Sequence, residues 1–349
     1  MQRYLPLLLL LTLAACDDAL DEQPLGDVLI ANQGNFSDAN GSITRYDPEA
    51  GTASTPVTGL GTVIQSLYVD GGTLYVASNT AGRVDVFDAA TLQRTGQITG
   101  LVSPRYMVRV GTKLYVTNLY ADAQTFSGGS VSVVDVGQRR VIKTIPVGNN
   151  PEGIVAVGSR LFVANHGFGS GSTVTIIDTA TDKAVSTVPL GCEGPRTLLV
   201  DLEQDIWAVC TGRTLYDANF NVVGHTAGAL RVLDGNSGLV QTRIAIDAPL
   251  GSEGPGQDAT RDGRWLYVVQ DARKVLRFNT TTNLQEGSFT VTGDPIGAIA
   301  HDGEVLYLGR VPGFTTAGAV TVHRTDGAEQ RRFTAGVAPA YIAFARDAD

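Results

Sequence analysis

A short apolar strand pattern recurs seven times along the chain, and each recurrence opens a unit that closes with a further apolar strand. The seven strands lie at residues 28–32, 74–78, 114–118, 161–165, 206–210, 266–270 and 306–310. Their starts are separated by 46, 40, 47, 45, 60 and 40 residues. A repeat of roughly 40–50 residues that contains only strand-like segments is typical of a β-propeller. The sequence therefore predicts an all-β fold, a seven-bladed β-propeller.

Each unit divides into four strands. The second unit shows their order most clearly, with strands at 74–77, 83–88, 95–98 and 106–110. The strand at 83–88 alternates apolar and polar residues, as expected for a sheet with one face against each neighbouring blade. The equivalent strands of several units end in an aspartate, at Asp88, Asp135, Asp178 and Asp234. Because these residues occur once per blade and precede a turn, we expect them to accept backbone N–H bonds rather than bind a metal.

The two ends of the repeat complement each other. The first unit begins at Val28 with what is the second strand of the other units, so it lacks an inner strand. The C-terminal region supplies one at 340–344, after Pro339, which marks the same position in other units. We therefore expect three N-terminal strands and one C-terminal strand to form a four-stranded antiparallel blade that closes a propeller over residues 27–349. Closure removes the exposed sheet edges that favour aggregation.

The repeat resembles the YVTN-type seven-bladed propeller repeat. The segments that carry this resemblance are 114–118, 131–135, 141–147 and 151–154, followed in the next unit by 161–165, 174–178, 184–190 and Pro195. The fifth unit departs most, because its first strand reads Ile-Trp-Ala-Val-Cys and a long insertion follows. In that family the strand that begins with the proline lies along the central channel. The resemblance is specific for the fold and weak for activity, because propellers host many unrelated functions.

Composition favours one domain and excludes one class of partner. The repeat covers nearly all of the 349 residues, which argues for a single repeat domain. The formal net charge is −9, and an acidic surface repels phosphate backbones. The densest basic cluster, Arg139 and Arg140 with Lys143, is expected to form a solvated turn. We therefore expect no nucleic-acid partner.

The N-terminal region has the pattern of a bacterial export signal. Arg3 is followed by an apolar run at 5–13, which is too short to span a bilayer as a helix. The ending Leu-Ala-Ala-Cys at 13–16 resembles a lipobox, which implies that residues 1–15 are removed and that Cys16 is lipidated. The acyl chains would then anchor the protein to a membrane without a transmembrane helix. An ordinary signal peptide with an incidental cysteine is the alternative.

Residues 16–26 form an acidic, unpatterned tether behind this cysteine. An Asp directly after a lipidated Cys resembles the inner-membrane retention signal of enteric bacteria. Acidic residues at the same place resemble the cell-surface export signal of Bacteroidetes-type bacteria. The expected location is therefore the outer membrane or cell surface, with the periplasmic face of the inner membrane as the alternative.

Loop lengths point to one face of the predicted ring. The long segments all follow the recurring strand, at 33–41, 119–129, 166–171, 211–228 and 311–318. In a four-stranded up-and-down blade they emerge beside the blade-to-blade connections, and function usually lies on loops carried by a rigid scaffold. The candidate ligand-binding residues there are Asn32, Phe36, Arg105, Asn118, Tyr120, Phe126, Glu152, Asn165, His166, Phe168, Arg196, Tyr216, Phe220, Asp258, Arg310 and Phe314. Aromatic rings mixed with a few polar groups suit a ligand site or a docking surface, although each ring alone could simply hold its own loop.

Cys192 and Cys210 are the two cysteines that remain after Cys16. One precedes the inner strand of the fifth unit and the other ends the next strand, so both are expected on the long-loop face. Export to an oxidising compartment favours a disulfide between them. Two buried thiols are the alternative, since strand register could leave the Cα atoms beyond the ~7 Å limit.

Catalytic motifs are absent from the sequence. It contains four His residues and no Gly-x-Ser-x-Gly elbow, paired-His motif or phosphate loop, so we predict no catalytic residues and no metal ligands. A metal-dependent, lactonase-like hydrolase is kept as an alternative. Such an enzyme would need Asn118, Glu152, Asn165 and Asp258 to converge.

Residues 29–36 and 41–51 resemble the start of the surface propeller lipoproteins of Bacteroidetes. Some members of that group cap TonB-dependent transporters and capture cobalamin. The resemblance implies a non-enzymatic protein, monomeric outside its complex, whose ligand is a corrinoid and whose partner is a TonB-dependent outer-membrane receptor. It implies no resident cofactor. A docking scaffold without a small ligand is the alternative.

Overall fold

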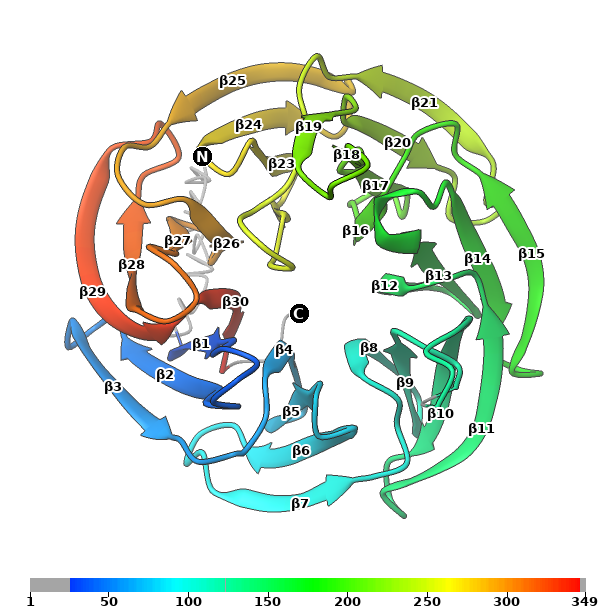
Figure 1. Ribbon diagram of the computed structural model, residues 1–349, viewed down its shortest axis with the longest axis horizontal. Coiled ribbons are helices and arrows are strands. Elements are labelled where there is room, and N and C mark those ends of the chain that lie inside the picture. Colours follow the sequence, from blue (N-terminus) through cyan, green and yellow to red (C-terminus); the bar gives the residue numbers. More distant parts are fainter. Residues whose placement is uncertain (1–25, 123, 346–349) are drawn as a thin grey trace, which may run out of the picture.

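The computed structural model describes residues 26–122 and 124–345, and these residues form a closed ring of seven blades (Figure 1). Each blade is a four-stranded antiparallel sheet whose inner strand faces the axis of the ring. The predicted fold class is therefore confirmed. The expected export signal, Cys16 and most of the acidic tether lie outside the described residues.

From the axis outward, each of the first four blades contains four strands. Blade 1 consists of β30 (Pro339–Phe344), β1 (Val28–Asn32), β2 (Ser42–Asp47) and β3 (Thr52–Val57); blade 2 of β4 (Ile64–Asp70), β5 (Thr73–Ser78), β6 (Arg83–Asp88) and β7 (Arg94–Ile98). Blade 3 consists of β8 (Pro104–Val110), β9 (Lys113–Asn118), β10 (Gly129–Asp135) and β11 (Arg140–Val147); blade 4 of β12 (Pro151–Val157), β13 (Arg160–Asn165), β14 (Thr173–Asp178) and β15 (Lys183–Pro189).

The remaining blades complete the ring. Blade 5 consists of β16 (Pro195–Val200), β17 (Ile206–Cys210), β20 (Ala229–Leu233) and β21 (Val240–Ala245); blade 6 of β22 (Ala259–Asp262), β23 (Trp265–Gln270), β24 (Lys274–Asn279) and β25 (Leu284–Thr290). Blade 7 consists of β26 (Ile296–His301), β27 (Leu306–Arg310), β28 (Ala317–His323) and β29 (Glu329–Val337). Two smaller elements lie in long loops: the hairpin of β18 (Thr214–Tyr216) with β19 (Val222–His225), and the 3-10 turn η1 (Gly167–Gly169).

The ring closes as the sequence predicts, by pairing the C-terminal strand with the first N-terminal strand. β30 runs antiparallel to β1, with Ile342 opposite Ile30 and Phe344 opposite Val28. Figure 1 shows the red β30 beside the blue β1 at the seam of the ring. This blade therefore joins the two ends of the propeller and leaves β1 no free inner edge.

The hydrophobic core is divided among the interfaces between neighbouring blades. All five residues of β17 are buried. Trp207 and Val209 pack into the cluster shared with blade 6, whereas Ala208 and Cys210 pack into the cluster shared with blade 4. Because the second strand of a blade is covered on both faces, its sequence is a nearly continuous apolar run. Burying each large apolar side chain contributes roughly 1.5–3 kcal/mol.

The aspartates that end the third strands form turns, as predicted. Asp88 Oδ1 accepts hydrogen bonds from the backbone N and the Oγ1 of Thr91, at 2.7 and 2.8 Å. Asp178 repeats both bonds with Thr181, at 2.8 and 2.7 Å. These bonds stabilise the carboxylate and lower the pKa of both Asp residues. The repeated Asp thus shapes the turn toward the outer strand.

Long connections gather on one face of the ring. Turns between first and second strands are short, for example 71–72, 111–112 and 158–159. The connections between second and third strands reach 33–41, 119–128, 166–172, 211–228 and 311–316. We call the face that carries these segments, together with the blade-to-blade connections, the long-loop face.

Candidate functional site

Two buried ion pairs lie near the axis at the long-loop end of the inner strands. Arg105 donates to Glu152 through Nε at 2.8 Å and through Nη2 at 2.6 Å, which makes a bidentate pair between blades 3 and 4. Arg196 makes a second bidentate pair with Asp258. The side chains are 8% and 5% exposed in the first pair, and 12% and 0% in the second. The structure thus brings four of the predicted site residues to the axis, where they bond to each other.

A segment from the blade 5–6 connection, residues 251–257, extends toward the axis at this end. Arg196 Nη1 donates to the carbonyl oxygen of Gly254 at 3.0 Å. Gln65, from blade 2 across the ring, donates through Nε2 to Pro255 O at 2.7 Å. The last residue of the segment also bonds to β30. In Figure 1 this yellow segment reaches inward from the ring. We call residues 251–257 the plug.

A small cavity of about 80 Å³ lies along the axis among the inner strands. Tyr106 and Tyr341 line it, with ring centroids 6.1 Å apart. The Tyr106 hydroxyl is buried and has no hydrogen-bond partner among the residues that the structure describes. Burial raises the pKa of Tyr106 far above its usual range and raises that of Tyr341 to about 12, so both phenols are neutral at physiological pH.

Asn32, Asn118 and Asn165 end the second strands of blades 1, 3 and 4, and their amides are used inside the fold. Asn165 Nδ2 donates to the hydroxyls of Thr173 and Thr175, both at 2.9 Å, and its Oδ1 accepts from Gly148 N at 3.1 Å. Asn32 and Asn118 make the same kinds of bonds in their own blades. All three are buried. The Asn118 and Asn165 amides therefore tie their blades to the connections that enter them, and the Asn32 amide ties blade 1 to the end of β29 in blade 7.

Arg310 occupies the same position in blade 7. Its side chain is almost fully buried, and Nη2 donates to the carbonyl oxygens of Thr292, at 2.6 Å, and Asp294. Burial lowers the pKa of this guanidinium. The structure places Arg310 under the connection from blade 6 to blade 7 rather than on the open surface.

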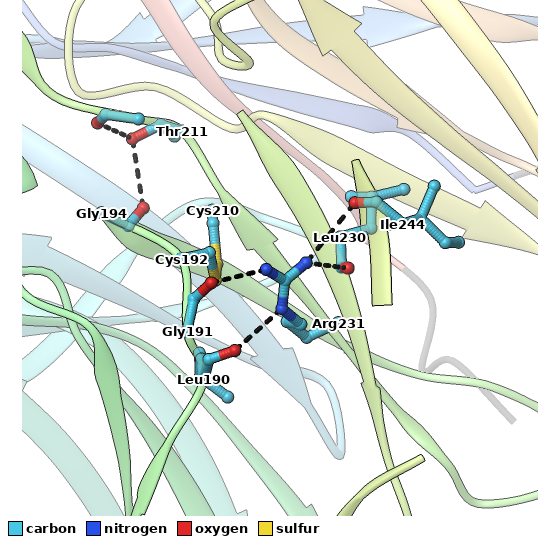
Figure 2. The surroundings of a disulfide bond; sticks show 10 residues. Leu190, Gly191, Cys192, Gly194, Cys210, Thr211, Leu230, Arg231 and Ile244 are labelled. Atoms are coloured by element: carbon cyan, nitrogen blue, oxygen red, sulfur yellow. Dashed lines mark hydrogen bonds between the residues drawn. A yellow bond between two sulfur atoms is a disulfide. The ribbon is translucent and has the colours of Figure 1, made fainter. Parts of the chain in front are cut away.

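Cys192 and Cys210 form a disulfide, which confirms the sequence-based expectation (Figure 2). Their Cα atoms are 6.1 Å apart, within the reach of such a bond. Figure 2 shows the guanidinium of Arg231 beside the bridge, donating to Leu190 O at 2.8 Å and Gly191 O at 2.7 Å. The bridge ties β17 to the connection that enters blade 5, the task that Asn performs in blades 3 and 4.

The candidate aromatic residues are mostly exposed around this face. The exposed fractions are 70% for Phe36, 65% for Phe126 and Phe168, 58% for Tyr216, 86% for Phe220 and 39% for Phe314. Tyr120 is half-buried, with its ring centroid 5.4 Å from Phe126 and 6.3 Å from Phe168. The structure thus brings Tyr120, Phe126 and Phe168 together, whereas Phe36 lies on blade 1 and Phe220 at the tip of the β18–β19 hairpin.

Phe168 stands between two hollows and lines both. The first, of about 590 Å³, lies between blades 3 and 4 and also contacts Phe126. The second, of about 790 Å³, lies over blades 4 to 6, where His166, Tyr216 and Arg196 contribute to its walls. We call them the blade 3–4 hollow and the blade 4–6 hollow. Both open on the long-loop face.

His166 lies in the wall of the blade 4–6 hollow. Burial lowers its pKa to about 4, despite the nearby Glu152 carboxylate, because the charged imidazolium loses its hydration. Its Nδ1 accepts a 3.3 Å hydrogen bond from Gly169 N. The neutral tautomer compatible with that bond carries its hydrogen on Nε2. At neutral pH the ring is therefore an uncharged hydrogen-bonding group.

Several contributors to these hollows are not among the candidates from the sequence. Arg213 and the plug line the blade 4–6 hollow, and Asn149 lines the other. Arg213 contacts Glu193 at 3.4 Å on the surface. The connection patterns Gly-Asn-Asn-Pro and Gly-Ser-Glu-Gly-Pro, beside short proline-led strands, are the sequence signals that mark Asn149 and the plug.

Two further properties concern metals and membranes. Within residues 26–122 and 124–345, no group of three or more His, Cys, Asp or Glu side chains is placed to hold a metal ion. In the same part of the chain, no helix has the length and apolar character needed to cross a membrane.

The fold defines a class, the seven-bladed β-propellers, and three solved structures are similar to it over most of their length. Hydrazine synthase from Kuenenia stuttgartiensis is similar with a TM-score of 0.63 and 21% identity, over 80% of this chain and 88% of that chain. The computationally designed Ika8 protein is similar with a TM-score of 0.61 and 11% identity, over 92% of each chain. Apo AztD from Citrobacter koseri is similar with a TM-score of 0.56 and 13% identity, over 91% of this chain and 97% of that chain.

At these identities the likeness shows the fold alone. No family model and no curated protein sequence matches the chain.

Proposed function

We propose that this protein is a non-enzymatic, lipid-anchored propeller that captures a bulky small ligand on its long-loop face. The observation that carries the proposal is the blade 4–6 hollow of about 790 Å³. Its rim offers the exposed rings of Phe168 and Tyr216, and its wall offers the neutral imidazole of His166. Apolar rings with a few placed polar groups are the usual composition of a ligand site.

A corrinoid is the first ligand to test. Residues 29–36 and 41–51 resemble the start of surface lipoproteins that include cobalamin-capturing members, and this resemblance motivates the choice. A corrinoid combines apolar ring edges with amide side chains, so it suits aromatic rims flanked by hydrogen-bonding groups. The partner proposed with it is a TonB-dependent outer-membrane receptor.

The proposed attachment is a lipid on Cys16, at the outer membrane or cell surface, with the periplasmic face of the inner membrane as the alternative. The lipobox-like pattern at 13–16 supports the lipid, and the acidic residues behind it support surface export. The mass of the mature N-terminal peptide tests the lipid, and protease treatment of intact cells tests the location. An N-terminal peptide whose mass shows no lipid would mean that the protein is not anchored through Cys16.

A docking scaffold is the second candidate function. The β18–β19 hairpin exposes Phe220, Val222 and Val223, at 86%, 56% and 63%. An exposed apolar group of this kind suits contact with another protein. This candidate predicts that Phe220→Ala abolishes binding to the receptor and leaves affinity for a small ligand unchanged.

The lactonase-like alternative receives less support. It needs Glu152 and Asp258 as free carboxylates, whereas each is bonded to an arginine. The amides of Asn118 and Asn165 are likewise used within their blades. These contacts favour binding over catalysis at the axis. Activity against lactones that disappears in Glu152→Gln would reverse this preference.

Calorimetry with cyanocobalamin tests the main proposal. We expect saturable binding by the purified protein, and an increase in unfolding free energy of about 2.7 kcal/mol when free ligand is a hundredfold above Kd. Tyr216→Ala is expected to weaken binding at least tenfold, because it removes an exposed ring from the rim of the hollow.

Leu202→Ala is the matched control. Leu202 is 62% exposed, close to the 58% of Tyr216, but it lies in the turn between β16 and β17 on the opposite face. The affinity of this variant for cyanocobalamin should equal that of the wild type. Absence of both heat and thermal shift with cyanocobalamin would rule out corrinoid capture, and equal losses in both variants would rule out this hollow as the site.

A further inference from the structure

The blade 3–4 hollow differs from its neighbour in charge. Its wall is formed by Phe126, Ser127, Gly128, Gly148, Asn149, Asn150, Asn165, Gly167, Phe168, Ser170, Gly171, Ser172 and Thr173. None of these residues is charged, although 17% of the whole chain is Asp, Glu, Lys or Arg. Aromatic, Ser, Gly and Asn residues together form adaptable binding surfaces in recognition loops. The composition therefore points to a binding site for a neutral ligand.

The aromatic rings of this hollow are held outward at a cost in free energy. Phe126 and Phe168 are each 65% exposed, and their φ angles of 51° and 53° lie in the left-handed region. A bulky residue in that region costs on the order of 1–3 kcal/mol. Tyr120 supports both rings from behind, at 5.4 and 6.3 Å between centroids. Two loops from different blades thus present a preformed aromatic surface.

Two glycines in the wall of the hollow stand where a side chain would not fit. A Cβ on Gly148 would lie 2.4 Å from Asn165 Cγ, and one on Gly171 would lie 2.0 Å from Asn165 O. Glycine at these positions lets both connections pack directly against Asn165, so the backbone fixes this part of the wall.

Polar groups remain free at the edge of this hollow. Asn149 and Ser172 are exposed, and neither the Asn149 amide nor the Ser172 hydroxyl has a hydrogen-bond partner in the described part of the chain. Asn165 and Thr173 bond to each other instead. The hollow thus offers the Asn149 side-chain amide and the Ser172 hydroxyl beside two aromatic rings.

We propose that the blade 3–4 hollow binds a neutral sugar ring, as part of an oligosaccharide. A pyranose presents C–H groups on its faces, which pack against aromatic rings, and hydroxyls at its edge, which bond to amides and hydroxyls. A charged group entering the hollow would be desolvated without a countercharge among the lining residues, which is unfavourable. A purely aromatic ligand would leave Asn149 and Ser172 without partners. This site is distinct from the proposed corrinoid site, and the two share only Phe168.

Saturation-transfer NMR with maltohexaose, cellohexaose and mannohexaose tests this site, with hexagalacturonate as the charged comparison. We expect transfer from protein aromatic protons to the ring C–H protons of at least one neutral hexaose. Phe126→Ala is expected to weaken that binding at least tenfold, and Asn149→Ala about fivefold. Hexagalacturonate should bind at least tenfold more weakly than the neutral sugar.

Two variants separate this site from the corrinoid site. Tyr216→Ala lies in the other hollow and should leave sugar binding unchanged, while Phe126→Ala should leave cyanocobalamin binding unchanged. Leu239→Ala, 67% exposed in the turn between β20 and β21 on the opposite face, is the control for loss of an exposed apolar side chain. Transfer to none of the three neutral sugars, equal binding of hexagalacturonate, or unchanged binding by Phe126→Ala would each overturn the sugar site.

Discussion

At the scale of single residues, the main feature near the axis of the ring is the pairing of buried charges. Arg196 and Asp258 are withdrawn from water, and the carboxylate also accepts hydrogen bonds from Ser252 N at 2.8 Å and Thr197 Oγ1 at 3.1 Å. A buried pair of this kind adds little net stability over an apolar pair, but removal of one partner leaves a buried charge uncompensated. Because Arg196 also holds the plug through Gly254, the pair links the axis to the ligand-facing loops.

The variant Asp258→Asn tests whether the fold depends on this ion pair, through the pH dependence of its unfolding free energy. Burial alone would raise the pKa of Asp258, but the ion pair with Arg196 and the bonds from Ser252 hold it below its usual value. A carboxyl whose pKa is lower in the folded than in the unfolded state stabilises the fold at pH values above its unfolded pKa of about 4. That stability is lost as the pH falls through the folded pKa. We therefore expect the variant to lose about 3–5 kcal/mol at pH 7.

The difference from wild type should begin to narrow below about pH 4, where Asp258 of the unfolded wild type takes up a proton, and should shrink further as the pH falls through the lower pKa of the folded state. Urea unfolding at pH 7, 5 and 3 measures both quantities. Asp217→Asn is the control, because Asp217 is exposed on the β18–β19 hairpin and bonds within its own turn. A loss at Asp258→Asn that is the same at pH 3 and pH 7 would contradict the ionic origin of the effect.

At the scale of elements, the ends of the second strands of blades 1, 3, 4, 5 and 7 have one recurring task, which different residues perform. Asn165 reaches from β13 to the connection that enters blade 4 through Gly148 N, at 3.1 Å. Arg310 reaches the carbonyl oxygens of the connection that enters blade 7. In blade 5 the link is covalent, from Cys210 to Cys192. Each link fixes the approach of one blade to the next and so sets the position of the long loops above it.

Loss of the disulfide should weaken blade 5 measurably. The two cysteines are 18 residues apart in sequence, and a loop of about this size corresponds to roughly 3 kcal/mol in the chain-entropy model. We therefore expect the double variant Cys192→Ala, Cys210→Ala to lose about 2–4 kcal/mol of unfolding free energy. Dithiothreitol should lower the stability of the wild type by a similar amount and leave the double variant unchanged. An equal effect of the reductant on both proteins would show that the bridge does not stabilise the fold.

At the scale of the whole molecule, the sequence repeat predicts the ring of blades. It does not predict which residues meet across that ring. The recurring strands at 28–32 and 206–210 coincide with β1 and β17, where burial on both faces favours a continuous apolar run. Residues 83–88 coincide with β6, which alternates apolar and polar residues. One end was misplaced: β20 stops at Leu233, so Asp234 belongs to the turn. Short-range patterns of this kind are visible in sequence because the strand itself imposes them.

The site depends on contacts between residues of different blades that are far apart in sequence, and no local pattern encodes them. Arg105 and Glu152 are 47 residues apart, and Gln65 meets Pro255 across 190 residues. The sequence placed Arg105 and Glu152 on the correct face, but their pairing with each other follows only from the closed ring. The β18–β19 hairpin also escaped prediction, because its strands of three and four residues are too short for a clear alternation.

Ring closure makes the last strand decisive for the whole propeller. β30 pairs with β1, and its Ile342 is buried in the cluster between blades 1 and 7. It also supplies the Ala340 carbonyl and the Ile342 N–H to Gln257, so it supports the plug.

Deletion of residues 338–349 should therefore give insoluble or unfolded protein, since it exposes the β1 edge and opens the core at the seam. A chain that ends at Ala345 keeps all of β30 and is the matched control. The variant Ile342→Ala should remain folded and lose about 2–5 kcal/mol of unfolding free energy. Solubility, circular dichroism and urea unfolding measure these outcomes, and a soluble, cooperatively folded 1–337 chain would mean that the ring does not need its C-terminal strand.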